Sequence, residues 1–85
     1  AAGAANQALK KYVEAVAAYD MALTTNTSDV ISYTYRGESK LSLGQADAGV
    51  DDLKMAVEVG KNQPFYKQWV DRSRTLLSVR QISTE

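Results

Sequence analysis

Apolar residues recur every three or four positions along most of the chain, which is the spacing of one face of an α-helix. The first such stripe consists of Ala5, Leu9, Tyr12, Val16, Tyr19 and Leu23. Residues 24–29 are polar and rich in side chains that cap helices, so they predict a loop. Ser28 or Asp29 is the expected N-cap of the next helix.

The segment from Val30 to Leu43 carries two conflicting signals. Residues 31–35 alternate apolar and polar side chains and are rich in β-branched and aromatic residues, which taken alone predicts a strand. No turn signal follows until Gly44, however, and fourteen residues is long for a strand and normal for a helix. The segment therefore predicts a helix that ends at Gly44.

The helical spacing resumes after Gly44 and predicts two more helices. One stripe comprises Ala46, Val50, Leu53 and Val57 and ends near Gly60. Residues 62–64 predict a turn, with Pro64 placed to open the last helix. One side of that helix holds Tyr66, Trp69, Val70, Ser73, Leu76 and Leu77, and we expect it to fray before Ile82. The predicted fold class is all-α.

The length and charge of the chain indicate how many domains it forms and which kinds of partner it binds. Eighty-five residues support one domain with a single core. Ten basic and ten acidic residues give no net charge, which argues against nucleic acid and anionic membranes as main partners. No stretch approaches the ~20 apolar residues of a membrane span, so we expect no membrane insertion. The opening residues lack the pattern of a signal peptide; the location stays unknown, with the cytoplasm favoured.

The charge is unevenly distributed along the chain. Residues 1–63 hold six basic and eight acidic residues, a net charge of −2, whereas residues 64–85 hold four basic and two acidic residues, a net charge of +2. A solvated face of the last helix explains this difference, and a basic patch for an acidic partner peptide is the alternative.

The chain contains neither His nor Cys. Zinc sites of the usual kinds, cysteine nucleophiles, Ser-His triads and imidazole acid–base catalysis are therefore excluded. We expect no cofactor and no metal, and the composition argues against an enzyme.

The sequence repeats itself at a shift of 34 residues. Identical pairs at this shift include Val16 and Val50, Met21 and Met55, and Ala22 and Ala56. Tyr19 falls on Leu53, so a large side chain alternates with small ones in both copies. Small residues let a neighbouring helix approach, and the large residue fills the space between the helices.

With this period of paired helices, the chain resembles the tetratricopeptide repeat family. The motifs that carry the resemblance are Tyr33-x2-Arg36-Gly37, Leu43-Gly44, Asp52-Leu53 and Ala56. The resemblance implies antiparallel helical hairpins stacked as a short right-handed superhelix. It divides the chain into a partial first repeat (1–26), a second repeat (27–61) and a third-helix or capping segment (62–85). The implied structural residues are Tyr19, Ala22, Tyr33, Arg36, Gly37, Asp52, Leu53 and Ala56.

Some positions depart from the family pattern. Thr27 and Lys61 stand where the family usually ends a repeat with Pro, and Gly49 replaces the usual Ala at a cost of ~1 kcal/mol. Lys10 replaces the Gly that ends the first helix of a repeat. We expect a helix break near Lys10, although the uninterrupted apolar stripe leaves a single helix over residues 2–24 open.

The alignment also predicts an ion pair. The second repeat has Arg36 in its first helix and Asp52 in its second, and antiparallel packing brings them side by side. The equivalent positions of the first repeat are Ala2 and Ala18, so both charges are absent together. We predict a salt bridge between Arg36 and Asp52.

The resemblance implies a protein-interaction module that binds a partner peptide or protein segment in a concave groove, in a scaffold or adaptor role. The groove candidates are Thr34, Tyr35, Glu38, Leu41, Phe65, Gln68, Trp69 and Arg72. Aromatic residues dominate interface hot spots, so Tyr35, Phe65 and Trp69 are the sharpest candidates, although core packing is the favoured role of Trp69. The alternative function is homodimerisation, in which the incomplete first hairpin packs on a second copy.

Overall fold

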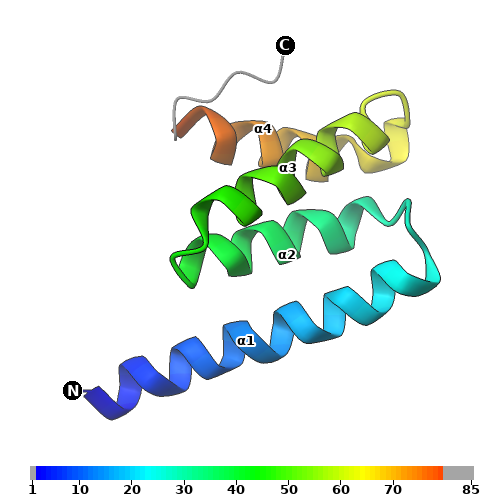
Figure 1. Cartoon of the computed structure of the whole chain (residues 1–85). Helices are drawn as coiled ribbons and strands as arrows, with labels where there is room; N and C mark the ends of the chain where they lie inside the picture. The colour runs from blue at the N-terminus through cyan, green and yellow to red at the C-terminus, as the bar shows by residue number, and fades with distance from the viewer. Residues whose placement is uncertain (1, 80–85) are drawn as a thin grey trace.

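The computed structural model describes the backbone of residues 2–79 and the side chains of residues 10–79. Its elements are α1 (Ala2–Thr25), α2 (Val30–Ser42), α3 (Ala46–Gly60), a 3-10 turn η1 (Pro64–Tyr66) and α4 (Lys67–Val79). Consecutive helices run antiparallel, and α3 and α4 lie above α2 and α1 (Figure 1). The all-α prediction is confirmed, because this part of the chain contains no strand and residues 31–35 are helical. None of the described helices is long and apolar enough to cross a bilayer.

The first helix is continuous, so the expected break near Lys10 is wrong. α1 runs for 24 residues without interruption. Lys is a good helix former, and no Pro or Gly lies between Gly3 and Gly37 to end the helix earlier. Local propensity therefore decides this segment, and the described part of residues 1–26 is one helix that packs on α2.

The loop between α1 and α2 shows which residue caps the second helix. Asp29 is the N-cap, and its carboxylate accepts hydrogen bonds from the backbone N–H of Ser32 at 3.1 Å and from the Ser32 hydroxyl at 2.8 Å. Ser28 instead donates its N–H to the side chain of Asn26. The sequence left both candidates open, and the structure selects Asp29.

α2 ends as the sequence predicts. Gly44 has a φ of +80°, a left-handed conformation that glycine adopts without a steric penalty. The N–H of Gln45 then bonds back to the carbonyl of Lys40 at 2.8 Å, which satisfies an acceptor at the end of the helix.

Pro64 does not open the last α-helix directly. It begins η1, the 3-10 turn that leads into α4 at Lys67. The expected fraying before Ile82 lies outside the described residues.

The core lies among α2, α3 and α4. Its buried members are Val30, Val50, Leu53, Ala56, Val57, Val70 and Leu77. Tyr33 packs against this cluster and donates its hydroxyl hydrogen to the carbonyl of Thr27 at 3.0 Å, which ties the loop after α1 to α2. Leu53 and Ala56, two of the implied structural residues, are fully buried, whereas Ala22 on α1 is only half-buried.

The predicted ion pair between α2 and α3 is confirmed. Arg36 donates from Nε to Oδ2 of Asp52 at 2.9 Å and from Nη2 to Oδ1 at 2.6 Å. Lys40 also contacts Asp52 at 3.0 Å, and Arg36 reaches Asp20 of α1 at 2.7 Å. The hydrogen bonds that Arg36 donates to Asp52 are the main reason that the pKa of Arg36 is raised. This cluster of four charges links α1, α2 and α3.

Candidate protein-interaction face

A bidentate ion pair joins two of the predicted groove residues, one on α2 and one on α4. Arg72 donates from Nε and Nη2 to the two carboxylate oxygens of Glu38, and both distances are 2.7 Å. The paired geometry fixes the planes of both groups and is stronger than a single contact. It also raises the pKa of Arg72, to which the nearby Tyr35 hydroxyl adds a smaller contribution. The pair therefore marks a surface shared by the two helices, which we call the α2–α4 face.

A hollow of about 300 Å³ lies beside this ion pair. Glu38, Leu41 and Ser42 of α2 line one side, and Leu76 and Val79 of α4 line the other. Three of these five side chains are aliphatic, and Val79 is 77% exposed. The hollow can receive an apolar side chain of a partner, with the Glu38 carboxylate at its edge.

Thr34 does not belong to this surface, so its assignment to the groove is wrong. Thr34 is fully buried. Its hydroxyl lies within hydrogen-bond distance of the Val30 carbonyl, to which it donates at 2.9 Å, and of the Ser73 hydroxyl of α4 at 3.2 Å, where either group can donate. Both hydroxyls are fully buried, and each is the other's partner across the contact between α2 and α4. Thr34 therefore holds the two helices together.

Tyr35 lies at the contact between α1 and α2. Its ring stacks on that of Tyr19, with 6.1 Å between the ring centroids, and both residues are half-buried. Tyr35, a predicted groove residue, therefore packs its ring on α1. Tyr19, which the resemblance implied to be structural, packs α1 against α2 through this contact.

Three aromatic residues gather where η1 meets α4. Phe65 is 75% exposed and lies 5.0 Å from the ring of Tyr66 and 6.2 Å from that of Trp69. Trp69 packs against the core, and its buried indole N–H has no acceptor among the described residues. Phe65, Trp69, Arg72 and Leu76 fall on successive turns of one side of this segment, and the exposed Gln68 lies one turn before Arg72.

The structure therefore joins Glu38 to Arg72 with Leu41 in the adjacent hollow, and it places Phe65 against Trp69. The hollow also holds three residues that the sequence analysis did not assign to the groove, namely Ser42, Leu76 and Val79. Leu76 and Val79 line the hollow, and Leu76 lies one turn after Arg72 on the same side of α4. Helical spacing could have identified Leu76, because it continues the series of Phe65, Trp69 and Arg72. No comparable signal marks Val79.

The chemistry of the face consists of apolar and aromatic contacts with one ion pair. The described residues contain no group of three or more His, Cys, Asp or Glu side chains that could hold a metal ion.

No family model matches the chain, and neither the curated proteins nor the solved structures give a significant match.

Proposed function

We propose that this chain is a protein-interaction module, not an enzyme, and that its α2–α4 face binds a segment of a partner protein. The observation that carries the proposal is the aliphatic hollow of Leu41, Leu76 and Val79 beside the Glu38–Arg72 ion pair. Two half-buried aliphatic side chains and the exposed Val79, beside an oriented ion pair, provide the mixed apolar and polar contacts of a protein interface. A scaffold or adaptor role follows from such binding.

The character of this face favours an apolar partner segment. Glu38 and Arg72 neutralise each other, so the residues around the hollow carry no net charge. The proposed ligand is therefore a short segment with an aliphatic anchor for the hollow.

We extend the proposal to the architecture, as a short right-handed superhelix of the tetratricopeptide type. Supporting features are the 34-residue repeat, the close α2–α3 hairpin and the Arg36–Asp52 pair between its helices. In such a stack the first helices of successive repeats would be α2 and α4, and their shared side would be concave.

The test begins with peptides selected from a random displayed library against the intact chain. Binding is followed through the fluorescence of Trp69, the one tryptophan, and mapped through backbone amide shifts. We expect shifts at Glu38, Leu41 and Leu76. Selected peptides that shift only residues outside the α2–α4 face would contradict the proposal.

Two matched variants sharpen this test. Val79→Asp and Met21→Asp each place a carboxylate at a highly exposed position, 77% and 74% exposed, so neither is expected to unfold the chain. Of these two residues, only Val79 lines the hollow. Val79→Asp should weaken peptide binding about ten-fold, equivalent to ~1.4 kcal/mol, and Met21→Asp should leave it unchanged.

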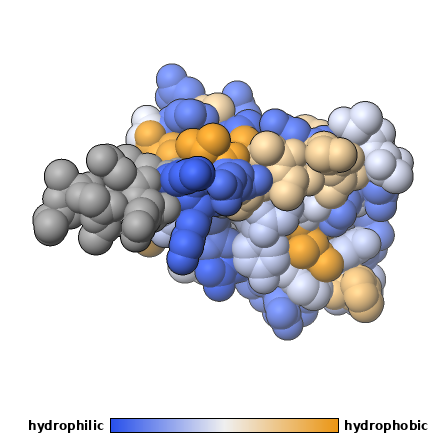
Figure 2. Space-filling view, turned by 90° about the horizontal axis from the view of Figure 1, so that it is seen from below, coloured by the Kyte–Doolittle hydropathy of each residue, from blue (hydrophilic) through white to orange (hydrophobic). Residues whose placement is uncertain are grey.

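Self-association through α1 is the second candidate function. Val13 is 56% and Met21 74% exposed, and Figure 2 shows hydrophobic patches among hydrophilic atoms on the side of the molecule where α1 lies. Analytical ultracentrifugation at high micromolar concentration should then show a dimer that Met21→Asp abolishes, and a monomer would contradict it.

A further inference from the structure

A second hollow, of about 340 Å³, lies at the turn between α3 and α4. Residues 60–64 form one wall, and Lys67, Val70, Asp71 and Arg74 of α4 form the other. The α4 residues repeat at positions i, i+3, i+4 and i+7, so they occupy one side of the helix. This side is opposite to the one that bears Arg72 and Leu76, which makes the hollow distinct from the α2–α4 face.

Local geometry holds the wall of this hollow in place. A Cβ on Gly60 would lie 2.7 Å from a methyl carbon of Val70, so only glycine lets the end of α3 approach α4 this closely. The N–H of Gln63 then bonds to the carbonyl of Gly60 at 2.9 Å, and its side-chain amide donates to the carbonyl of Val59 at 2.8 Å. The turn is therefore braced before any ligand arrives.

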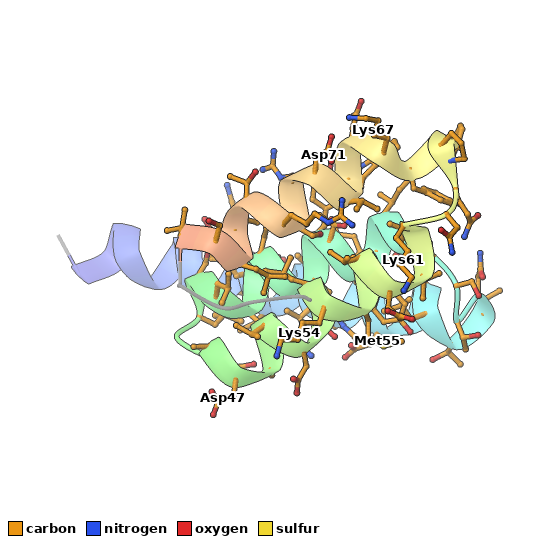
Figure 3. The ribbon with its side chains drawn as sticks, turned by 90° about the horizontal axis from the view of Figure 1, so that it is seen from above. Asp47, Lys54, Met55, Lys61, Lys67 and Asp71 are labelled. Carbon is orange, nitrogen blue, oxygen red and sulfur yellow. The ribbon has the colours of Figure 1, made fainter. Side chains whose placement is uncertain are left out.

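The lining is predominantly cationic. Lys61, Lys67 and Arg74 contribute three positive charges and Asp71 one negative charge, and the amide side chains of residues 62 and 63 are also present. Figure 3 shows Lys61 at the end of α3, across from Lys67 and Asp71 on α4. We call this set of residues the basic hollow.

Two of its cations make ion pairs that a ligand can replace. Lys67 contacts Asp71 at 2.7 Å on the same helix, and Lys61 contacts Glu58 at 3.1 Å. All four side chains are more than 40% exposed, and exposed pairs of this kind contribute little to stability. A carboxylate of the ligand can therefore replace Glu58 at Lys61 or Asp71 at Lys67 with little loss of stability.

We propose that the basic hollow docks an acidic segment of a partner protein, with a carboxylate side chain held among Lys61, Lys67 and Arg74. The acidic partner is chosen by charge complementarity, because the lining has a net charge of +2, and the exposed Pro64 adds apolar contact area. Residues 1–63 carry a net charge of −2, which opposes the long polyanion of a nucleic acid.

The first experiment titrates the isotope-labelled intact chain with hexaglutamate peptide at low salt and follows amide shifts. Shifts should concentrate on residues 60–64, Lys67 and Arg74, and the affinity should fall with added salt. Lys61→Gln/Arg74→Gln should weaken binding about five- to ten-fold. The matched control Lys54→Gln/Lys11→Gln removes the same charge outside the hollow and should change binding less than two-fold.

A gain of binding provides the second experiment. Asp71→Asn removes the one carboxylate of the lining and frees Lys67, so hexaglutamate should bind about three-fold tighter. Asp47→Asn makes the same change at the far end of α3 and should have no effect (Figure 3).

Three outcomes would overturn the proposal. If Lys61→Gln/Arg74→Gln and the control Lys54→Gln/Lys11→Gln weaken hexaglutamate binding equally, the attraction is nonspecific. An unchanged affinity of Asp71→Asn for hexaglutamate would show that the hollow is not the site. Tighter binding of polyuridylate or inorganic phosphate than of hexaglutamate would identify another class of ligand.

Discussion

Two glycines, Gly37 and Gly49, face each other where α2 and α3 come closest. A Cβ on Gly49 would lie 2.8 Å from the carbonyl oxygen of Gly37, and a Cβ on Gly37 would lie 2.8 Å from a side-chain carbon of the fully buried Leu53. Both obstacles are rigid, so either added methyl group would push the helices apart. At the residue scale, the absence of two side chains sets the distance between these helices.

This contact reverses the effect expected of Gly49→Ala from sequence. Helix propensity alone predicts a gain of ~1 kcal/mol, whereas the clash predicts a net loss of about 1–2 kcal/mol in the free energy of unfolding. Urea denaturation measures the sign, and Ala48→Gly measures the propensity contribution at the neighbouring position. A more stable Gly49→Ala variant would contradict the packing.

The charge cluster around Arg36 also acts at the residue scale. The Asp52 side chain is 7% exposed and that of Arg36 is 17% exposed, so removing one partner leaves a poorly solvated charge. We expect Asp52→Ala to lower the free energy of unfolding by about 2–3 kcal/mol, because Arg36 keeps Asp20 but Lys40 loses its partner. A double-mutant cycle with Arg36→Ala should give a coupling of about 1–2 kcal/mol.

The control for this cycle is Asp51→Ala, an exposed neighbour on α3. It should change stability by less than about 0.5 kcal/mol. Absence of coupling between Arg36 and Asp52 would mean that their contact contributes nothing beyond the two separate side chains.

At the scale of the element, the helix ends depend on local hydrogen bonds and backbone angles. Asp29 begins α2, Gly44 ends it, and Pro64 leads through η1 into α4. α1 shows the same rule, since it continues through Lys10 because nothing in its sequence stops it. The boundaries of these elements are therefore set by residues within or next to them.

The cap of α2 provides a prediction at this scale. Asp29→Ala removes the acceptor for the N–H and the hydroxyl of Ser32, and should lower the free energy of unfolding by about 1 kcal/mol. Ser28→Ala is the control and should cost less than about 0.5 kcal/mol. Thermal unfolding followed by circular dichroism measures both, and equal losses would show that Asp29 has no special role.

At the scale of the whole molecule, side chains from distant parts of the sequence hold α4 on α2. The buried contact is the hydrogen bond between Thr34 and Ser73, and the exposed one is the ion pair between Glu38 and Arg72. α4 also packs on α3 through Val70 and Leu77 of the core. The two proposed binding surfaces lie on opposite sides of α4, so its placement positions both of them.

Removing the buried hydroxyl of Thr34 tests this arrangement. Thr34→Val keeps the shape but leaves Ser73 without this partner, which should cost about 1–2 kcal/mol of the free energy of unfolding. Adding Ser73→Ala should recover part of that loss, because no unpaired hydroxyl then stays buried. Thr75→Val is the matched control, since Thr75 makes the same bond to a carbonyl four residues earlier but is exposed. Strictly additive losses in the double variant would contradict the pairing.

Much of the fold followed from the sequence because its causes are local. The three- and four-residue spacing predicted the helices, Gly44 predicted a stop, and the 34-residue repeat placed Arg36 beside Asp52. The repeat was misleading at Lys10, where the resemblance favoured a break and helix propensity favoured continuity. Within α2, spacing alone did not separate the side facing α4 from the exposed side, so Thr34 was assigned to the groove although it is buried.

By itself, then, the sequence determined which segments are helical, where α2 ends and that Arg36 pairs with Asp52. Only the tertiary structure decided the unfavourable effect of a methyl group at Gly49, the pairing of Glu38 with Arg72 and the contribution of Val79 to the hollow. Helix formation depends on residues three or four positions apart, which the sequence displays directly. The packing of α4 depends on how closely α3 approaches α2 and where the turn at Gly60 directs the chain, and these are properties of the assembled helices.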